Sequence, residues 1–440
     1  MNWRLTIGAM AVITLIAFEQ MATTTAMPAV VEDLGGLALF PISAGIGLAA
    51  QVFTITIAGG WCDKKGPAPV LFTGLILFAS GLLMCAFAPT MIVFVIGRAI
   101  QGLGAGLVVV PVYVMAGYLV PGNKLPAFFA MLSFAWVTPS LLGPAVAGLI
   151  IRALSWHWVF GIAAPLALLT SLPLFSVVKQ VPKGDPDKLS LARGAIVSAA
   201  ITGFALALLQ GVSSMELIPM LIVTLTCFGV LLKVLPSILP EGALRARRGL
   251  SAVVMVRLTA MGALGVGTAF LPLILVRYHG WDELQAGVAL SFTSVTWACA
   301  SFTQSRVVRI ERRMKLPILG GFLILTGCLG SLTLASLTLH PALGVGLWSI
   351  AGFGAGLVAA PSSVLALEVS DPSVHGTVSA YLQNADAVGP SLAMGLVSVL
   401  FASTAQLSTP ISFAPAPIII AIMALVAIFM AKRIPTRSMQ

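Results

Sequence analysis

Long apolar runs, separated by short polar segments, follow one another along almost the whole 440-residue sequence. A helix that crosses the hydrocarbon core of a bilayer needs about 20 predominantly apolar residues. Fourteen runs reach that length, and they lie at about 5–28, 40–60, 68–89, 91–116, 126–151, 157–178, 191–211, 216–236, 250–276, 284–305, 316–338, 342–366, 376–402 and 412–431. Hydrophobic residues form 59% of the chain and charged residues only 9%, too little polar surface to cover a water-facing globule. The pattern predicts an all-α polytopic membrane protein with 14 transmembrane helices.

The positions of the basic residues support this number of helices independently. If the N-terminus is cytoplasmic, 20 of the 24 lysines and arginines lie on the cytoplasmic side. Cytoplasmic loops of membrane proteins carry such an excess of Lys and Arg. We therefore expect both termini in the cytoplasm, in the cell (inner or plasma) membrane, with the lipid bilayer as a partner. These loops explain the net charge of +10, so a nucleic-acid partner is not indicated.

Two pairs of similar segments indicate an internal repeat. GLGAGLVVVP, at 102–111, returns 250 residues later as GFGAGLVAAP, and LLGPAVAG, at 141–148, returns within AVGPSLAMG, at 387–395. Many transporters are built from such repeats, although glycine-rich apolar helices also resemble one another by chance. The repeat predicts an N-terminal six-helix bundle at 1–180, an inserted two-helix pair with cytoplasmic linkers at 181–248, and a C-terminal six-helix bundle at 249–440.

Glu19 and Arg98 lie inside predicted spans, where a charge costs about 2.5–3.5 kcal/mol on the lenient insertion scale and indicates a function. Glu19 lies about 22 Å from the cytoplasmic end of its helix, at 1.5 Å per residue, and Arg98 lies at similar depth in a helix of opposite direction. Burial favours the protonated acid, whereas a neighbouring guanidinium favours the carboxylate. A movement of Arg98 would then load or release a proton at Glu19, and we predict both as proton-coupling residues. A static buried ion pair is the alternative.

Two polar side chains share a helix face with this pair. Thr23 follows Glu19 by one turn, and Gln101 follows Arg98 by three residues. We predict Glu19, Thr23 and Gln101 as substrate-binding residues. For Gln101, a hydrogen bond that only joins two helices is an equally open interpretation.

Asp386 lies near the middle of the predicted span 376–402, with Gln383 one turn before it on the same side. We predict Asp386 as a second proton-coupling site, or as a substrate-binding residue for a cation together with Gln383. A carboxyl group that pairs with a neighbouring helix is the alternative.

Arg257 lies in the inner third of its span, where snorkelling of its side chain to the cytoplasmic interface explains it without a function.

Two motifs are similar to those of a known family. The loop after the second predicted span carries Gly59, Asp63, Lys64 and Gly66 in the pattern G-x-x-x-D-[RK]-x-G, and the fourth span carries R-x-x-Q-G-x-G from Arg98. Both resemble motifs of the major facilitator superfamily.

Two further segments narrow the resemblance to the fourteen-span drug:proton antiporters of that superfamily. PSLLGPAVAG, at 139–148, is similar to the antiporter-type motif of the fifth span, with Gly143, Pro144 and Gly148 in place. FEQMATTTAMPAVVEDLGG is similar to the first span of the subfamily, with Glu19 where aspartate is usual.

The resemblance implies a proton-coupled secondary active transporter that exports hydrophobic, cationic small molecules by alternating access, as in multidrug resistance efflux. It also implies that Asp63 sits at a helix N-terminus and latches the two halves together. Nine residues are predicted to have such gating or conformational roles: Gly59, Asp63, Lys64, Gly66, Gly143, Pro144, Gly148, Gly389 and Pro390.

Motifs for other functions are missing from the sequence. It contains no G-x-S-x-G nucleophile motif, no phosphate-binding G-x-x-x-x-G-K-[ST] and no metal-ligand spacing. We therefore expect a protein without enzymatic activity, cofactor or metal, which uses an ion gradient to move its substrate. We also expect it to be a monomer. A proton-coupled importer of a metabolite remains an alternative, as does a non-transporting membrane receptor or lipid-handling scaffold.

Overall fold

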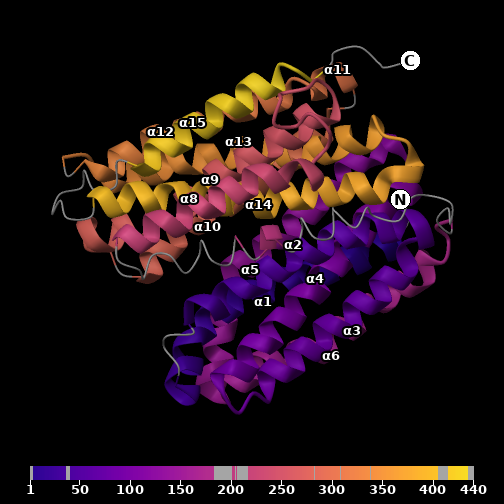
Figure 1. Ribbon diagram of the computed structural model, residues 1–440, viewed down its shortest axis with the longest axis horizontal. Helices are drawn as coiled ribbons and strands as arrows, with labels where there is room; N and C mark the ends of the chain where they lie inside the picture. Colours follow the sequence, from indigo (N-terminus) through magenta and orange to yellow (C-terminus); the bar gives the residue numbers. More distant parts are fainter. Residues whose placement is uncertain are drawn as a thin grey trace. The chain divides into compact units, whose positions relative to one another are not determined.

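The computed structural model, shown in Figure 1, describes residues 3–35, 40–182, 201–203, 205, 217–281, 283–307, 309–336, 338–404 and 415–434. Within these ranges the chain is helical and contains no strand, which confirms the predicted all-α class. The long helices are α1 (Trp3–Leu34), α2 (Phe40–Lys65), α3 (Pro67–Ala86), α4 (Met91–Leu119), α5 (Leu125–Ala153), α6 (Trp156–Val178), α8 (Leu217–Val234), α9 (Leu250–His279), α10 (Glu283–Ser305), α12 (Leu316–Ala335), α13 (Pro341–Glu368), α14 (His375–Thr404) and α15 (Pro415–Ala431).

Shorter helical segments lie in the connections. They are the α-helix α11 (Ile310–Arg313) and the 3-10 turns η2 (Gly122–Lys124), η4 (Leu235–Ser237) and η5 (Pro372–Val374). Thr90 shows how such a connection starts a long helix, because its hydroxyl accepts a hydrogen bond from the Val93 amide in the first turn of α4.

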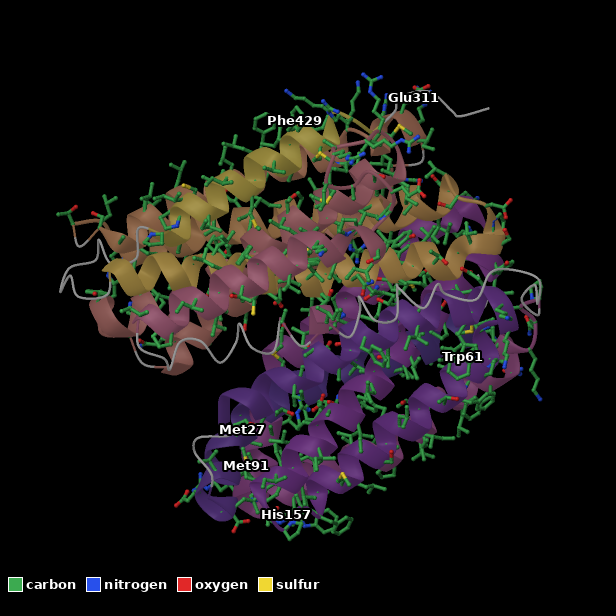
Figure 2. All side chains as sticks on the ribbon, viewed as in Figure 1. Met27, Trp61, Met91, His157, Glu311 and Phe429 are labelled. Carbon is green, nitrogen blue, oxygen red and sulfur yellow. The ribbon has the colours of Figure 1, made fainter. Side chains whose placement is uncertain are left out.

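Eight segments among the described residues are long and apolar enough to cross a membrane: Trp3–Met27, Ile46–Lys65, Pro67–Ala86, Met91–Leu119, Trp156–Val178, Leu250–Thr268, Ile310–Ala335 and Pro341–Glu368. Large apolar side chains cover the outside of the helices. Leu149 is 68% exposed, and Figure 2 shows Phe429 pointing away from α15. Exposed apolar surface of this extent suits lipid rather than water, so the chain is a multi-pass membrane protein. The total of 14 spans remains a prediction, since 191–211 lies mostly outside the described residues.

The chain forms two compact units. Unit 1 comprises Met1–Gly211 and Ser370–Asn384, and unit 2 comprises Val212–Val369 and Ala385–Gln440. Helix α14 therefore contributes its first turns to unit 1 and its remainder to unit 2. The predicted boundaries at 1–180, 181–248 and 249–440 remain a prediction.

The glycine motif of α4 lets two helices of unit 1 approach it closely. A Cβ atom added to Gly102 would lie 2.1 Å from the Gly47 carbonyl oxygen of α2, and one added to Gly104 would lie 2.2 Å from the Phe78 nitrogen of α3. Gly106 faces α2 again, at Thr54. Alternate glycines thus pack α4 against α2 and α3 in turn, because only hydrogen fits between the backbones.

The repeated motif of α13 makes matching contacts in unit 2. A Cβ atom added to Gly352 would lie 2.6 Å from Thr293 of α10, one added to Gly354 would lie 2.6 Å from the Gly320 carbonyl of α12, and one added to Gly356 would lie 2.4 Å from the Trp297 carbonyl of α10. The same residue pattern therefore produces the same three-helix packing in each unit, as expected for a duplicated frame.

Candidate functional site

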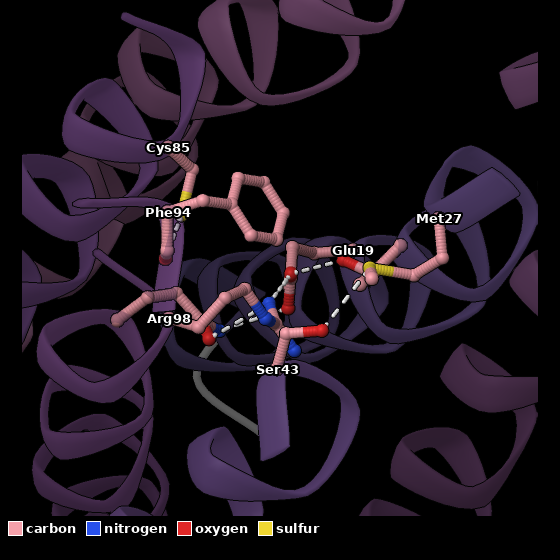
Figure 3. A network of polar contacts seen from close by, with 8 residues as sticks. Glu19, Met27, Ser43, Cys85, Phe94 and Arg98 are labelled. Carbon is pink, nitrogen blue, oxygen red and sulfur yellow. Dashed lines mark hydrogen bonds and ion pairs between the residues drawn. The ribbon is translucent and has the colours of Figure 1, made fainter. Parts of the chain in front are cut away.

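Glu19 of α1 is the centre of a buried hydrogen-bond network in unit 1. In Figure 3, Glu19 and Arg98 point toward one another. Nη1 of Arg98 donates to Glu19 Oε1, to which Thr23 Oγ1 also donates at 2.7 Å, and Gln101 Nε2 donates to Glu19 Oε2 at 2.8 Å. Arg98 Nη1 donates in addition to Gln101 Oε1, at 3.0 Å. The sequence predicts that Thr23 shares a helix face with Glu19 and that Gln101 shares one with Arg98. In the structure these four side chains form one connected hydrogen-bond network.

This network is almost completely closed to its surroundings. Glu19 is 2% exposed and Arg98 is 5% exposed. The carboxylate and the guanidinium balance each other, which makes the network tolerable at membrane depth. Removing one partner of such a buried pair leaves an uncompensated charge, at a cost of about 3–5 kcal/mol.

The glycines beside Arg98 explain why the network fits between helices. A Cβ atom added to Gly47 of α2 would lie 3.3 Å from Arg98 Nη2, and the contact of Gly47 with Gly102 holds α2 against α4 one turn beyond the arginine. Ser43 of α2, one turn before Gly47, donates to the Met27 sulfur at 3.8 Å (Figure 3). The fourth-span motif thus combines the network residues with the small residues that make room for them.

A second ion pair, Arg257 of α9 with Asp386 of α14, lies in unit 2. Arg257 Nε donates to Asp386 Oδ1 at 2.6 Å, and Nη2 donates to Oδ2 at 2.6 Å, so the contact is bidentate. Nη1 donates to the Ala359 carbonyl at 3.0 Å and to the Ser363 hydroxyl, both on α13. The prediction that Arg257 snorkels to the interface is wrong, because a carboxylate and two further acceptors hold its head group inside the unit.

The two partners of this second pair differ in exposure. The Arg257 side chain is 5% exposed and that of Asp386 is 29% exposed. Gly389 and Pro390 place the acid: a Cβ atom at Gly389 would lie 2.1 Å from the Leu258 carbonyl, and Pro390 packs on Gly265. This close approach of α14 to α9 sets Asp386 against Arg257.

The repeat does not relate the two pairs. The position 250 residues after Arg98 is Trp348, whose ring lies between α9 and α12 and is 1% exposed. A Cβ atom at Gly267 would lie 1.8 Å from Trp348 Cη2, and one at Gly327 would lie 2.6 Å from Cζ3. Unit 2 therefore has a tryptophan packed against glycines at the position that corresponds to Arg98, where unit 1 has an ion pair with Glu19.

Asp63, at the end of α2, binds the first turn of α14 within unit 1. Its Oδ1 accepts from the Gly376 amide at 2.8 Å, and its Oδ2 accepts from the Thr377 amide at 2.9 Å and from the Thr377 hydroxyl. Three donors at a helix N-terminus favour a negative charge there. The sequence predicted a helix N-terminus as the partner of Asp63 but did not identify which helix.

The other residues of the second-span loop shape this contact. A Cβ atom at Gly59 would lie 2.8 Å from the Gly376 carbonyl, so glycine is needed for α14 to approach. Gly66 has φ 78°, which turns the chain between α2 and α3, and Pro67 occupies the first turn of α3. Lys64 lies in the last turn of α2.

The remaining predicted residues are more dispersed. Gly143 of α5 faces Met21 of α1, whereas an added Cβ atom at Gly148 would meet no atom within 4 Å. Pro144 lies within α5. Gln383 is a buried residue of α14 in unit 1, and no described contact joins it to Asp386.

Sequence reasoning missed three polar residues that the structure brings into contacts. Ser363 binds Arg257, and Asn384 Nδ2 donates to Thr56 Oγ1 of α2 at 3.0 Å. The sequence did contain a signal for Asn384, because this polar residue directly follows Gln383 and lies two positions before Asp386. In the described part of the chain, no group of three His, Cys, Asp or Glu side chains could hold a metal ion.

The fold and the site define a polytopic membrane protein of the transporter class. The defining features are long apolar helices, a duplicated glycine frame and arginine–carboxylate pairs inside the helix packing. The chain belongs to the Major Facilitator Superfamily, whose sequence profile matches residues 9–394. This membership indicates a non-enzymatic transporter, in agreement with the prediction from the sequence.

Individual relatives are similar only at low identity. The multidrug transporter protein MdtP of Bacillus subtilis (strain 168) is 24% identical over 363 residues, which cover 80% of this chain and 66% of that protein. The MFS-type transporter C1399.02 of Schizosaccharomyces pombe is 23% identical over 341 residues, which cover 74% of this chain and 58% of that protein. The chain thus spans less than two thirds of these relatives' own length.

The fold is similar to that of a solved transporter. The structure of the proton:xylose symporter XylE bound to 6-bromo-6-deoxy-D-glucose matches with a TM-score of 0.69 at 16% identity, and the match covers 99% of this chain and 96% of that one. At this identity the likeness concerns the fold alone.

Proposed function

We propose that the protein is a proton-coupled exporter of hydrophobic small molecules, of the fourteen-span drug:proton antiporter type, which works by alternating access. The observation that supports this best is the buried network of Glu19, Arg98, Gln101 and Thr23. A titratable acid enclosed with a cation at membrane depth is the arrangement that a proton relay needs.

The network links protonation of Glu19 to the position of Arg98. Glu19 accepts hydrogen bonds from three side chains, and a proton on its carboxyl group converts one of these acceptor positions into a donor. The guanidinium is then left without its counter-charge, so it moves toward another acceptor such as Gln101 Oε1, with which it already shares a hydrogen bond. Proton binding and side-chain rearrangement therefore occur together.

Asp63 supplies a contact that such a rearrangement could open and close. Its three hydrogen bonds to Gly376 and Thr377 fasten α2 to the start of α14. We propose that this contact forms and breaks during the transport cycle, and that Gly59, Lys64 and Gly66 shape it. We propose conformational roles also for Gly143, Pro144, Gly148, Gly389 and Pro390.

The proposed protein is a monomer in the cell (inner or plasma) membrane, with both termini in the cytoplasm. The excess of lysine and arginine on one side of the predicted spans supports this orientation. Among relatives, the name of MdtP supports multidrug efflux.

The charge of the substrate depends on how the acids act. The sequence favours a cation because Glu19 and Asp386 lie at membrane depth. Each acid is paired with an arginine in the structure, so a cation has to displace a guanidinium before it binds. Glu19 would meet this requirement once Arg98 has turned to Gln101.

Transport direction and coupling are tested in proteoliposomes with an imposed pH gradient and the membrane potential clamped by valinomycin and equal potassium. The test compounds are tetraphenylphosphonium, a hydrophobic cation, and 1-naphthoate, an aromatic carboxylate, with protein-free liposomes as the control. An antiporter accumulates substrate in an acidic lumen and alkalinises it. Accumulation that requires an acidic exterior would establish a symporter and overturn the export proposal, and no response to either compound under any gradient would contradict transport of these classes.

A further inference from the structure

Arg257 is held in place from two sides that belong to different helices. Its Nη1 donates to the Ala359 carbonyl and the Ser363 hydroxyl of α13, whereas its Nε and Nη2 together face Asp386 of α14. The α13 contacts do not involve Asp386. The guanidinium therefore keeps its position and direction when the carboxylate is removed from its other edge.

The edge that faces Asp386 has the geometry for binding a carboxylate. The Nε/Nη2 side of a guanidinium presents two parallel N–H groups that match the two oxygens of a carboxylate, and both distances to Asp386 are 2.6 Å. In this structure the ligand for that edge is a side chain of the protein itself.

Asp386 is the accessible member of the pair. Its side chain is 29% exposed, whereas that of Arg257 is 5% exposed. An ionised carboxylate does not face lipid at membrane depth, so its exposed part faces water or a ligand. A molecule arriving at this place therefore meets Asp386 first and the guanidinium behind it.

We propose that the Nε/Nη2 edge of Arg257 is a binding site for the carboxylate of a hydrophobic organic acid, and that Asp386 is an internal carboxylate which occupies the site when no ligand is bound. This assignment rests on the proposed function in one respect, namely that the organic acid is a substrate for transport. The site adds organic anions to the proposed substrates, whereas Glu19 and Asp386 considered alone predict only cations.

The exchange conserves charge if Asp386 takes up a proton as it leaves. The ligand carboxylate then compensates Arg257, and the displaced aspartic acid is neutral, so no unpaired charge remains in the unit. Within the described part of the chain, Arg257 of α9 is the charged group paired with Asp386. The groups of α13 that hold Arg257 are a carbonyl and a hydroxyl, which do not titrate. Binding of the organic acid is therefore coupled to uptake of one proton from water at Asp386. This proton accompanies the ligand and is distinct from the one that Glu19 exchanges in the proposed antiport.

The test is calorimetric titration of the detergent-purified protein with 1-naphthoate at pH 7.5, in two buffers of different protonation enthalpy. The comparison of buffers gives the number of protons taken up, and we expect about one for each naphthoate bound. In Asp386→Asn the internal competitor has no charge, so the affinity should rise by about tenfold or more and the proton uptake should disappear. The matched probe is 1-naphthylmethylammonium, which should not bind at this edge.

Two further variants control for folding and for location. Arg257→Gln alone leaves the Asp386 carboxylate without its counter-charge, so the double variant Arg257→Gln/Asp386→Asn, in which both groups are neutral, is the better test of the arginine. It should lose about tenfold or more of the naphthoate affinity while keeping the thermal unfolding temperature of the wild type. Glu32→Gln, which removes an exposed acid of unit 1, should bind naphthoate as the wild type does.

Wild-type affinity in the double variant would overturn the proposal, as would weaker naphthoate binding in Asp386→Asn. Binding of the ammonium probe that Asp386→Asn abolishes would assign Asp386 to cations instead, and would also overturn it. The titration needs no gradient and no direction of transport. Failure of gradient-driven exchange with intact binding would therefore contradict the exporter and leave this site standing.

Discussion

Arg98 of α4 and Glu19 of α1, which are 79 positions apart in the sequence, form an ion pair in which both side chains are almost completely buried. Thr23 and Gln101 supply the remaining hydrogen bonds of the carboxylate. An acid enclosed in this way is not an open binding surface. The proposed coupling links protonation of this acid to the position of the arginine.

Breaking this pair should destabilise the protein more than removing both charges. Arg98→Gln leaves Glu19 as a buried acid without its counter-charge, which should cost about 3–5 kcal/mol. The double variant Arg98→Gln/Glu19→Gln removes both charges and should recover much of that loss. The free energies of SDS-induced unfolding for the two single variants and the double variant measure this coupling, and additive losses would show that the side chains do not interact.

Gly102→Ala should destabilise the packing of α4 on α2. The added methyl group would lie 2.1 Å from the Gly47 carbonyl oxygen, and such overpacking costs about 1–3 kcal/mol, more than the gain of about 1 kcal/mol in helix propensity. Gly148→Ala is the matched control, because its methyl group would meet no atom within 4 Å. Thermal unfolding in detergent compares the two, and equal stability would contradict the close approach of α2 and α4.

Asp63→Asn should loosen the contact between α2 and the first turn of α14. The variant loses the charge and one of the two acceptor oxygens that bind Gly376 and Thr377. The neighbouring Cys62 is 3% exposed and packs in a cluster with Ala380 of α14, so opening of this contact uncovers its thiol.

Alkylation by N-ethylmaleimide measures this opening. We expect Cys62 to react about tenfold faster in Asp63→Asn, which corresponds to the loss of about 1.5 kcal/mol of charged hydrogen bonding. The exposed Cys299 provides an internal reference, and Glu32→Gln, which removes an exposed acid elsewhere, is the control. An unchanged Cys62 rate in Asp63→Asn would show that this contact does not close the cluster.

The sequence predicted the fold class and much of the first network for physical reasons that are local. Depth along a helix follows from counting residues, and it placed Glu19 and Arg98 at similar levels. Helical spacing placed Gln101 beside Arg98 and Thr23 beside Glu19. The glycine repeat indicated a duplicated frame, and the glycines of α4 and α13 make matching contacts.

The second pair was not predictable in the same way. Arg257 and Asp386 are 129 positions apart, and the residue pattern of neither helix indicates that α9 and α14 are neighbours. Each residue considered alone had an acceptable explanation, namely snorkelling for the arginine and ligand binding for the acid. The same limit applies to Asp63, whose partner Gly376 is 313 positions away.

The central claim is that Glu19 carries the proton that drives export, and the most direct measurement is the rate of lumenal alkalinisation when substrate is added to proteoliposomes with an acidic lumen. For a substrate that the wild type exchanges, Glu19→Gln should show no alkalinisation above that of protein-free liposomes, because a glutamine cannot release a proton. Glu32→Gln should alkalinise the lumen at the wild-type rate. Full coupled exchange by Glu19→Gln would contradict the account.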